Sequence, residues 1–155
     1  RIGREGELKE TSERLIHELG LDRHVILAGF RADALGLMKS LDLFVMSSVT
    51  EGLGSAMLEA MAASRAVVGT RAGGIPEAIV HEVTGLLVPT HDDQALARAI
   101  VALLGDPDRR RQFGAAGRAR VIDEFSVDRM VQRAVGAYRR ALAGPRAEGK
   151  GQRGG

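Results

Sequence analysis

The chain has 155 residues and a mass of 16.5 kDa, which suits one domain with a single hydrophobic core. Hydrophobic residues at 45% and charged residues at 27% exclude disordered and fibrous classes, and no apolar run approaches the roughly 18 residues that cross a membrane. The absence of cysteine excludes disulfides and thiolate catalysis, and an aromatic content of 3% argues against a stacking surface for nucleic acid.

The net charge of +2 is unevenly distributed along the chain. Residues 1–95 carry 9 basic and 14 acidic side chains, whereas residues 96–155 carry 13 basic and 6 acidic ones. Solvated helix faces are the simplest interpretation of the basic segment, and a surface for a partner or a membrane is the alternative. No secretory signal is visible, because no apolar stretch follows the positive charge at the N-terminus.

Apolar residues at helical spacing predict a first helix from Glu5 to Leu19, which ends at Gly20. Arg1 and Ile2 resemble the end of an earlier strand. Strands and helices then alternate, with strands predicted at 24–28, 41–46, 65–69 and 85–88 and helices between them at 32–40, 55–63 and 75–80. Three helices follow without strands, at 92–104, 107–122 and 126–143.

The predicted strands are continuous apolar runs, which is typical of strands covered by helices on both faces. The sequence therefore predicts an α/β fold with a Rossmann-like, doubly wound parallel sheet. Residues 1–143 would form this single domain, and the polar, glycine-rich residues 144–155 are expected to be a disordered tail.

Ligands of such sheets bind beyond the carboxyl ends of the strands, and the loop after the strand at 41–46 is the richest in candidates. Gly52 and Gly54 would let the backbone approach a ligand closely. Unpaired amides near Gly54, Ser55 and Ala56, at the start of the next helix, would favour a phosphate group. Ordinary turn chemistry is the alternative for these glycines.

Two glutamates flank this helix start. Glu59 is the only charged residue between Gly52 and Ser64, so we expect a carboxylate among apolar residues that needs either an arginine or a ligand hydroxyl as partner. Glu51 lies in the loop, where it could accept hydrogen bonds from sugar hydroxyls or remain a solvated loop acid.

A second tight turn, Gly73-Gly74, follows the strand at 65–69, and we expect its free amides to face the same crevice. The four histidines lack the spacing of a metal site. No serine stands in the frame of a nucleophile elbow.

The segment EGLG at 51–54, continued by EAMA at 59–62, resembles the E-x7-E motif of retaining family-4 glycosyltransferases. Further matching segments are VILAGF at 25–30, LDLFVMSS at 41–48, GGIPEAI at 73–79, TGLLVPTHDDQALARAI at 84–100 and DPDRRRQFGAAGRARVIDEFS at 106–126. The resemblance covers nearly all of residues 1–143.

The resemblance implies the C-terminal, donor-binding domain of a GT-B enzyme, which transfers a hexosyl group from a UDP- or GDP-sugar. Glu51 would contact the donor sugar as the catalytic residue, and Glu59 would contact the ribose hydroxyls. Amides at Gly54 and Ser55 would hold the diphosphate, and Gly29, Phe30 and Arg31 would border the base. The remaining residues of the implied donor site are Gly52, Leu53, Ala56, Gly73 and Gly74.

The sequence departs from the family in several places. Ser64 to Val68 replace a C-G-x-P-V-V stretch, Leu53 replaces an aromatic residue, and Ser47 replaces a proline. The first strand and helix of the domain are not recognised, nor are the arginine and lysine that the family places on the diphosphate. We therefore expect no transferase activity from this chain by itself, and association through exposed edges of the sheet.

The resemblance also implies no essential metal or cofactor. An acceptor sugar, lipid or small molecule would bind a separate N-terminal domain, and nucleic acid is not expected as a partner. We expect a cytoplasmic enzyme, with peripheral contact at the inner face of the membrane as a further expectation. The alternative function is a non-catalytic Rossmann-type module for nucleotide binding or protein interaction.

Overall fold

The computed structural model describes residues 5–142, which belong to two compact units that divide at Ala34. The first unit contains helix α1 (Glu5–Glu18), as predicted, and then an irregular segment. The predicted strand at 24–28 is wrong, because a strand needs a hydrogen-bonded neighbour and the sheet includes no strand from this unit. Instead, the Val25 amide donates to the Leu21 carbonyl at 2.9 Å, and Ile26 is 86% exposed.

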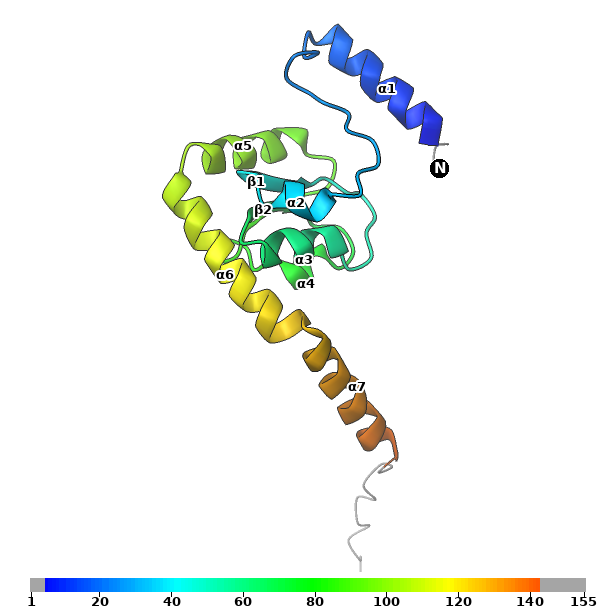
Figure 1. Ribbon diagram of the computed structural model, residues 1–155, viewed down its shortest axis with the longest axis vertical. Helices are drawn as coiled ribbons and strands as arrows, with labels where there is room; N and C mark the ends of the chain where they lie inside the picture. Colours follow the sequence, from blue (N-terminus) through cyan, green and yellow to red (C-terminus); the bar gives the residue numbers. More distant parts are fainter. Residues whose placement is uncertain (1–4, 143–155) are drawn as a thin grey trace, which may run out of the picture. The chain divides into compact units, whose positions relative to one another are not determined.

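From Ala34 onward, helices and strands alternate and then give way to helices alone, as predicted (Figure 1). The predicted strand at Arg1 and Ile2 and the predicted tail at 144–155 lie outside the described residues. The elements are α2 (Ala34–Met38), β1 (Leu43–Met46), α3 (Ser55–Ala62), β2 (Ala66–Thr70), α4 (Ile75–Ala78), β3 (Leu86–Val88), α5 (Asp93–Leu104), α6 (Pro107–Phe125) and α7 (Val127–Leu142).

The three strands form a parallel sheet in the order β1-β2-β3. Val45 of β1 lies beside Val68 of β2, which in turn lies beside Leu86 of β3. All residues of β2 and β3 are buried. The parallel pairing and the burial together confirm the prediction of a covered parallel sheet from continuous apolar runs.

Helices cover both faces of the sheet, which confirms the doubly wound fold (Figure 1). On one face, Val67 and Leu87 pack against buried residues of α3 and α4. On the other face, Val68 and Leu86 pack against α5 and the start of α6, where Phe113 is buried. Alternate residues of each strand thus supply two separate apolar clusters.

Arginines of α6 hold the ends of three other helices. Arg110 donates to the carbonyls of Leu103 and Leu104 at the end of α5, both at 2.6 Å. Arg120 donates to the carbonyls of Glu77 and Ala78 at the end of α4, at 2.8 and 3.0 Å. Arg118 donates to a carbonyl at the end of α3, that of Ala62. These partly or fully exposed side chains also satisfy helix carbonyls that lack intrahelical partners, a role that the interpretation of the basic segment as solvated faces does not include.

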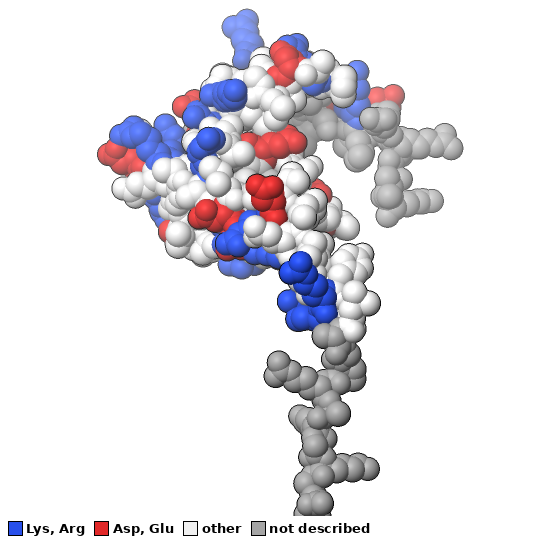
Figure 2. Space-filling view, turned by 60° about the horizontal axis from the view of Figure 1, so that its bottom comes forward, with Lys and Arg blue, Asp and Glu red and all other residues white. Residues whose placement is uncertain are grey.

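Helix α7 is amphipathic. Its apolar side chains remain exposed, with Val127 at 70%, Val131 at 51% and Tyr138 at 72%. Figure 2 shows basic side chains on one side of the end of this helix and uncharged side chains on the other. No helix between residues 5 and 142 is long and apolar enough to cross a membrane.

Candidate functional site

The carboxyl ends of β1, β2 and β3 lie at one edge of the sheet because the strands are parallel. The loops that follow them begin at Ser47, Arg71 and Pro89. The residues predicted to bind a ligand in the second unit lie in the first two of these loops or on α3. The fold therefore places the loops that carry the candidate residues at the edge where α/β proteins bind their ligands.

The two glycine-containing loops contact each other directly. The Gly74 amide donates to the Gly52 carbonyl at 2.6 Å. A Cβ atom at Gly73 would overlap the carbonyl oxygen of Glu51, so only glycine permits this contact. Convergence of the two loops is confirmed, but the prediction that Gly74 offers a free amide is wrong, because packing against the first loop uses that amide.

Glu51 is half-buried and held by its own loop. Its carboxylate accepts from the Gly52 amide at 3.0 Å and from the Ser48 hydroxyl at 3.3 Å. The buried Thr70 hydroxyl donates in turn to the Ser48 carbonyl. These bonds hold the Glu51 carboxylate in the loop at the carboxyl edge of the sheet.

Helix α3 begins at this loop with unpaired amides. Gly54 precedes the helix with a left-handed φ of 74°, and its carbonyl accepts from Met57 and Leu58 at 2.9 and 3.1 Å. The amides of Ser55 and Ala56 have no hydrogen-bond partner among residues 5–142. They are free to bind an anion at the positive end of the helix.

Glu59 is exposed, so the expectation of a carboxylate among apolar residues is wrong. Met57, Ala60 and Met61 form the buried side of α3, and Glu59 lies on the opposite side. Because Ala62, close to Glu59 on α3, is also apolar, the sequence did not distinguish this side of the helix from its buried side. No ion pair or hydrogen bond joins the Glu59 carboxylate to another residue between 5 and 142.

Glu59 lines a mainly apolar cavity of about 260 Å³ between α2 and α3. Leu35 and Lys39 form the wall on the side of α2, and Ala62 and Ala63 form the wall on the side of α3. A carboxylate without a protein partner at such a cavity can accept hydrogen bonds from a ligand.

The predicted base-binding residues lie in the first unit. Gly29 has a left-handed φ of 61°, and Phe30 is 95% exposed. Arg31 donates to both carboxylate oxygens of Asp33, at 2.8 Å from Nε and 2.7 Å from Nη2. This pair raises the pKa of Arg31 and lowers the pKa of Asp33. The Arg31 guanidinium therefore already binds a carboxylate two residues away in its own segment.

Sequence reasoning missed a cavity of about 290 Å³ at the carboxyl ends of the strands. Its polar lining includes Ser47 after β1, Thr70 at the end of β2 and Asp92 and Asp93 before and in α5. The Asp92 carboxylate accepts from the Ala95 amide at 2.8 Å and so caps the N-terminus of α5. Because the helix start alone accounts for an aspartate at this position, the sequence does not indicate that Asp92 also lines a cavity.

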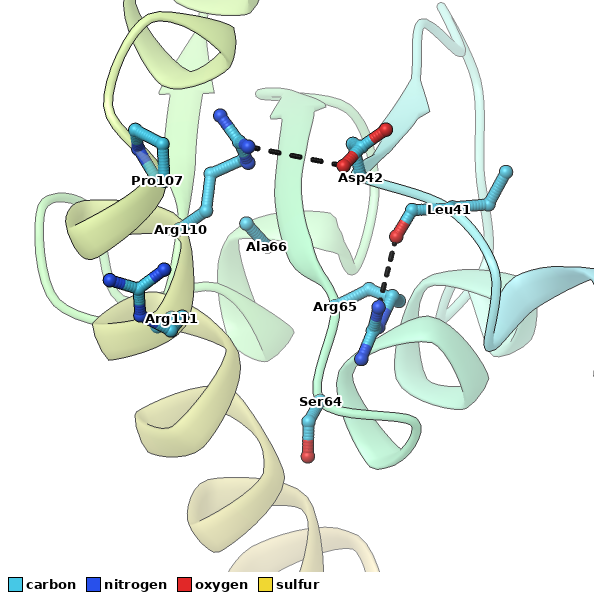
Figure 3. Close-up of a pocket in the computed structure, with 8 residues that line it drawn as sticks. All are labelled: Leu41, Asp42, Ser64, Arg65, Ala66, Pro107, Arg110 and Arg111. Atoms are coloured by element: carbon cyan, nitrogen blue, oxygen red, sulfur yellow. Dashed lines mark hydrogen bonds and ion pairs between the residues drawn. The ribbon is translucent and has the colours of Figure 1, made fainter.

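A third cavity, of about 210 Å³, lies at the opposite edge, where β1 and β2 begin (Figure 3). Its arginines point in different directions in Figure 3. Arg65 donates to the Leu41 carbonyl at 3.0 Å, and Arg110 donates to the end of α5. These guanidinium groups serve the fold. In the part of the chain that the structure describes, no cluster of three His, Asp or Glu residues could hold a metal ion.

Residues 2–120 match the family model described as "Glycosyl transferases group 1". Among curated proteins, alpha-maltose-1-phosphate synthase of Mycolicibacterium smegmatis is 42% identical over 113 residues, which are 69% of this chain and 29% of that protein. N-acetyl-alpha-D-glucosaminyl L-malate synthase of Bacillus anthracis is 33% identical over 121 residues, which are 78% of this chain and 32% of that protein. The chain thus spans about a third of these relatives.

Solved structures show the same fold. The C-terminal domain of a group 1 glycosyl transferase from Francisella tularensis has a TM-score of 0.71 and 33% identity, over 78% of this chain and 64% of that one. HepE of Anabaena, solved in complex with UDP, has a TM-score of 0.80 and 30% identity, over 89% of this chain and 38% of that one.

Proposed function

The chain belongs to the group 1 family of glycosyl transferases, and from this premise we propose that it binds the nucleotide-sugar donor of a retaining, family-4 type enzyme. The complete enzyme would transfer a hexosyl group from a nucleoside-diphosphate sugar to an acceptor. The observation that carries this proposal is the arrangement of Glu51 and the free amides of Ser55 and Ala56 around one loop at the carboxyl edge of the sheet.

The helix start would bind the diphosphate. The amides of Ser55 and Ala56 and the dipole of α3 stabilise negative charge, which increases on the nucleoside diphosphate as the bond to the sugar breaks. Gly52 and Leu53 are exposed in the same loop, so a ligand can approach this backbone closely. Gly73 and Gly74 support the loop from the neighbouring strand end.

The two glutamates of the E-x7-E pattern would bind hydroxyl groups. Glu51 is held toward the loop by Ser48 and Gly52 and would contact the donor sugar. Glu59 lines the cavity between α2 and α3, which supports a ligand role, and would accept from the ribose hydroxyls there. We propose that the nucleotide base is bordered by Gly29, Phe30 and Arg31.

The donor class is proposed from the relatives. HepE has been solved in complex with UDP and with UDP-glucose, and we propose a UDP- or GDP-sugar for this chain. The acceptor, a sugar, lipid or small molecule, would bind a separate N-terminal domain. We propose that neither a metal nor a cofactor is essential and that the enzyme is cytoplasmic. Peripheral contact with the inner face of the membrane is supported by the exposed apolar and basic sides of α7.

Calorimetric titration tests donor binding. We expect UDP or GDP and the corresponding sugar nucleotides to bind the chain in the presence of a chelator. Replacement of Glu59 by alanine should weaken this binding about tenfold or more, because a charge-assisted hydrogen bond to the ribose is lost. Glu10→Ala removes an exposed carboxylate from α1 and is the matched control, with unchanged affinity expected.

The outcomes separate the proposal from the alternative. Binding of a sugar nucleotide that Glu59→Ala weakens and Glu10→Ala does not supports the transferase donor site. Failure of a folded chain to bind any nucleotide, or equal binding by both variants, contradicts it.

A further inference from the structure

We propose that the cavity at the carboxyl ends of the three strands is a subsite for an uncharged sugar unit of an acceptor whose remainder binds the separate N-terminal domain. Ser47 after β1, Thr70 at the end of β2 and His91 after β3 bring all three strands to this cavity. The assignment of its sugar to the acceptor rests on the proposed function. Its volume of about 290 Å³ lies just below the range for small-molecule sites, roughly 300–1,000 Å³, and suits one sugar ring.

The lining offers the chemistry that hydroxyl groups require. A sugar hydroxyl both donates and accepts hydrogen bonds, and the cavity presents the Ser47 hydroxyl, the His91 imidazole and the Asp93 carboxylate. None of these three side chains is hydrogen-bonded to another residue between 5 and 142. Val49 and Leu96 supply apolar walls for the C–H faces of the ring.

The charge of the lining disfavours an anionic ligand. Asp92 and Asp93 contribute two carboxylates, and neither lysine nor arginine lines the cavity. A phosphate or carboxylate group would therefore meet like charge without a counter-ion. This distinguishes the cavity from the start of α3, where unpaired amides favour phosphate.

A chain of hydrogen bonds joins the cavity to the proposed donor site. The Thr70 hydroxyl, which lines the cavity, donates to the Ser48 carbonyl. The Ser48 hydroxyl donates to the Glu51 carboxylate at 3.3 Å. Ser47 and Val49, which line the cavity, belong to the same loop as Glu51, so a sugar in the cavity would contact the loop that carries the residue proposed for the donor sugar.

The test is an NMR titration of the full chain with methyl α-D-glucopyranoside, in the presence of saturating UDP-glucose so that both the nucleotide and the donor-sugar positions are filled and the glucoside cannot occupy the donor site. We expect the largest amide shifts at Ser47, Val49 and Leu96. Asp93→Asn should weaken glucoside binding about tenfold or more through loss of a charge-assisted hydrogen bond. Asp128→Asn, which removes the equivalent first-turn acid of α7, should leave the affinity unchanged.

Glucose 1-phosphate is the charged counterpart and should bind this cavity more weakly than the glucoside. Absence of glucoside shifts at the cavity in a protein that still binds UDP overturns the inference and leaves the proposed function intact. Equal glucoside affinity in the Asp93→Asn and Asp128→Asn variants also overturns it. If the glucoside binds the cavity but no nucleotide binds the chain, the cavity remains a sugar site. The proposed function is then contradicted, and so is the assignment of this sugar to the acceptor.

Discussion

Single residues determine the geometry of the candidate site, and they differ in how far their roles can be predicted. Glu51 was predictable from its position after a strand, since strand ends of a parallel sheet meet at one edge. The exposure of Glu59 was not, because small alanines around it give α3 an apolar sequence on its exposed side. The bond from the Gly74 amide to Gly52 joins loops from different strands, and local sequence does not encode such a contact.

Gly73→Ala tests the contact between the two loops. Its φ of 48° is unfavourable for alanine, and the new Cβ would overlap the Glu51 carbonyl oxygen. We expect a loss of about 1–3 kcal/mol in the free energy of unfolding, together with weaker binding of a sugar nucleotide. Urea unfolding and calorimetry measure the two effects.

Gly36→Ala is the matched control, because Gly36 has open space around it and lies in α2. We expect it to keep or slightly raise stability. If Gly73→Ala proves as stable and as active in binding as Gly36→Ala, the loop contact is not required.

Most helices and buried strands could be predicted from the sequence, because the spacing of their apolar residues reflects the way in which each element packs. The strands near Leu43, Ala66 and Leu86 lie where the patterns predict them, within two residues. The run at 24–28 has similar composition, but it forms no strand because strand formation depends on a distant partner. The capping roles of Arg118 and Arg120 on α6 could not be assigned from sequence, since the helix ends that they cap are distant along the chain.

Arg120→Ala tests the capping of α4 by α6. The substitution removes two hydrogen bonds to carbonyls and the contact of the guanidinium with the Phe125 ring, whose centroid lies 5.7 Å away. We expect unfolding in urea at lower concentration, with a loss of about 1–3 kcal/mol. Arg98→Ala on α5 removes an exposed arginine without such bonds, and its effect should stay within about 0.5 kcal/mol. Equal stability of the two variants would refute the capping role.

At the scale of the whole molecule, the sheet has an open edge. Within residues 5–142, β1 pairs with β2 on one side and with no strand on the other. Unpaired backbone groups at the edge of a sheet favour pairing with another chain. Val45 in the middle of this strand is 36% exposed.

We therefore expect the chain to associate in a concentration-dependent manner in sedimentation velocity experiments. Val45→Lys places a charge on the edge strand and should shift the chain toward the monomer. Val101→Lys changes a valine on α5 that is 70% exposed and should not. A monodisperse monomer at all concentrations, or equal effects of the two lysines, would refute association through β1.

Donor binding at the start of α3 is tested most directly by an amide NMR titration of the chain with UDP-glucose. We expect the largest shifts at Gly52, Ser55 and Ala56, because the diphosphate would bind the start of α3 beside Glu51. Shifts confined to the opposite edge of the sheet, around Arg65 and Arg110, would contradict it.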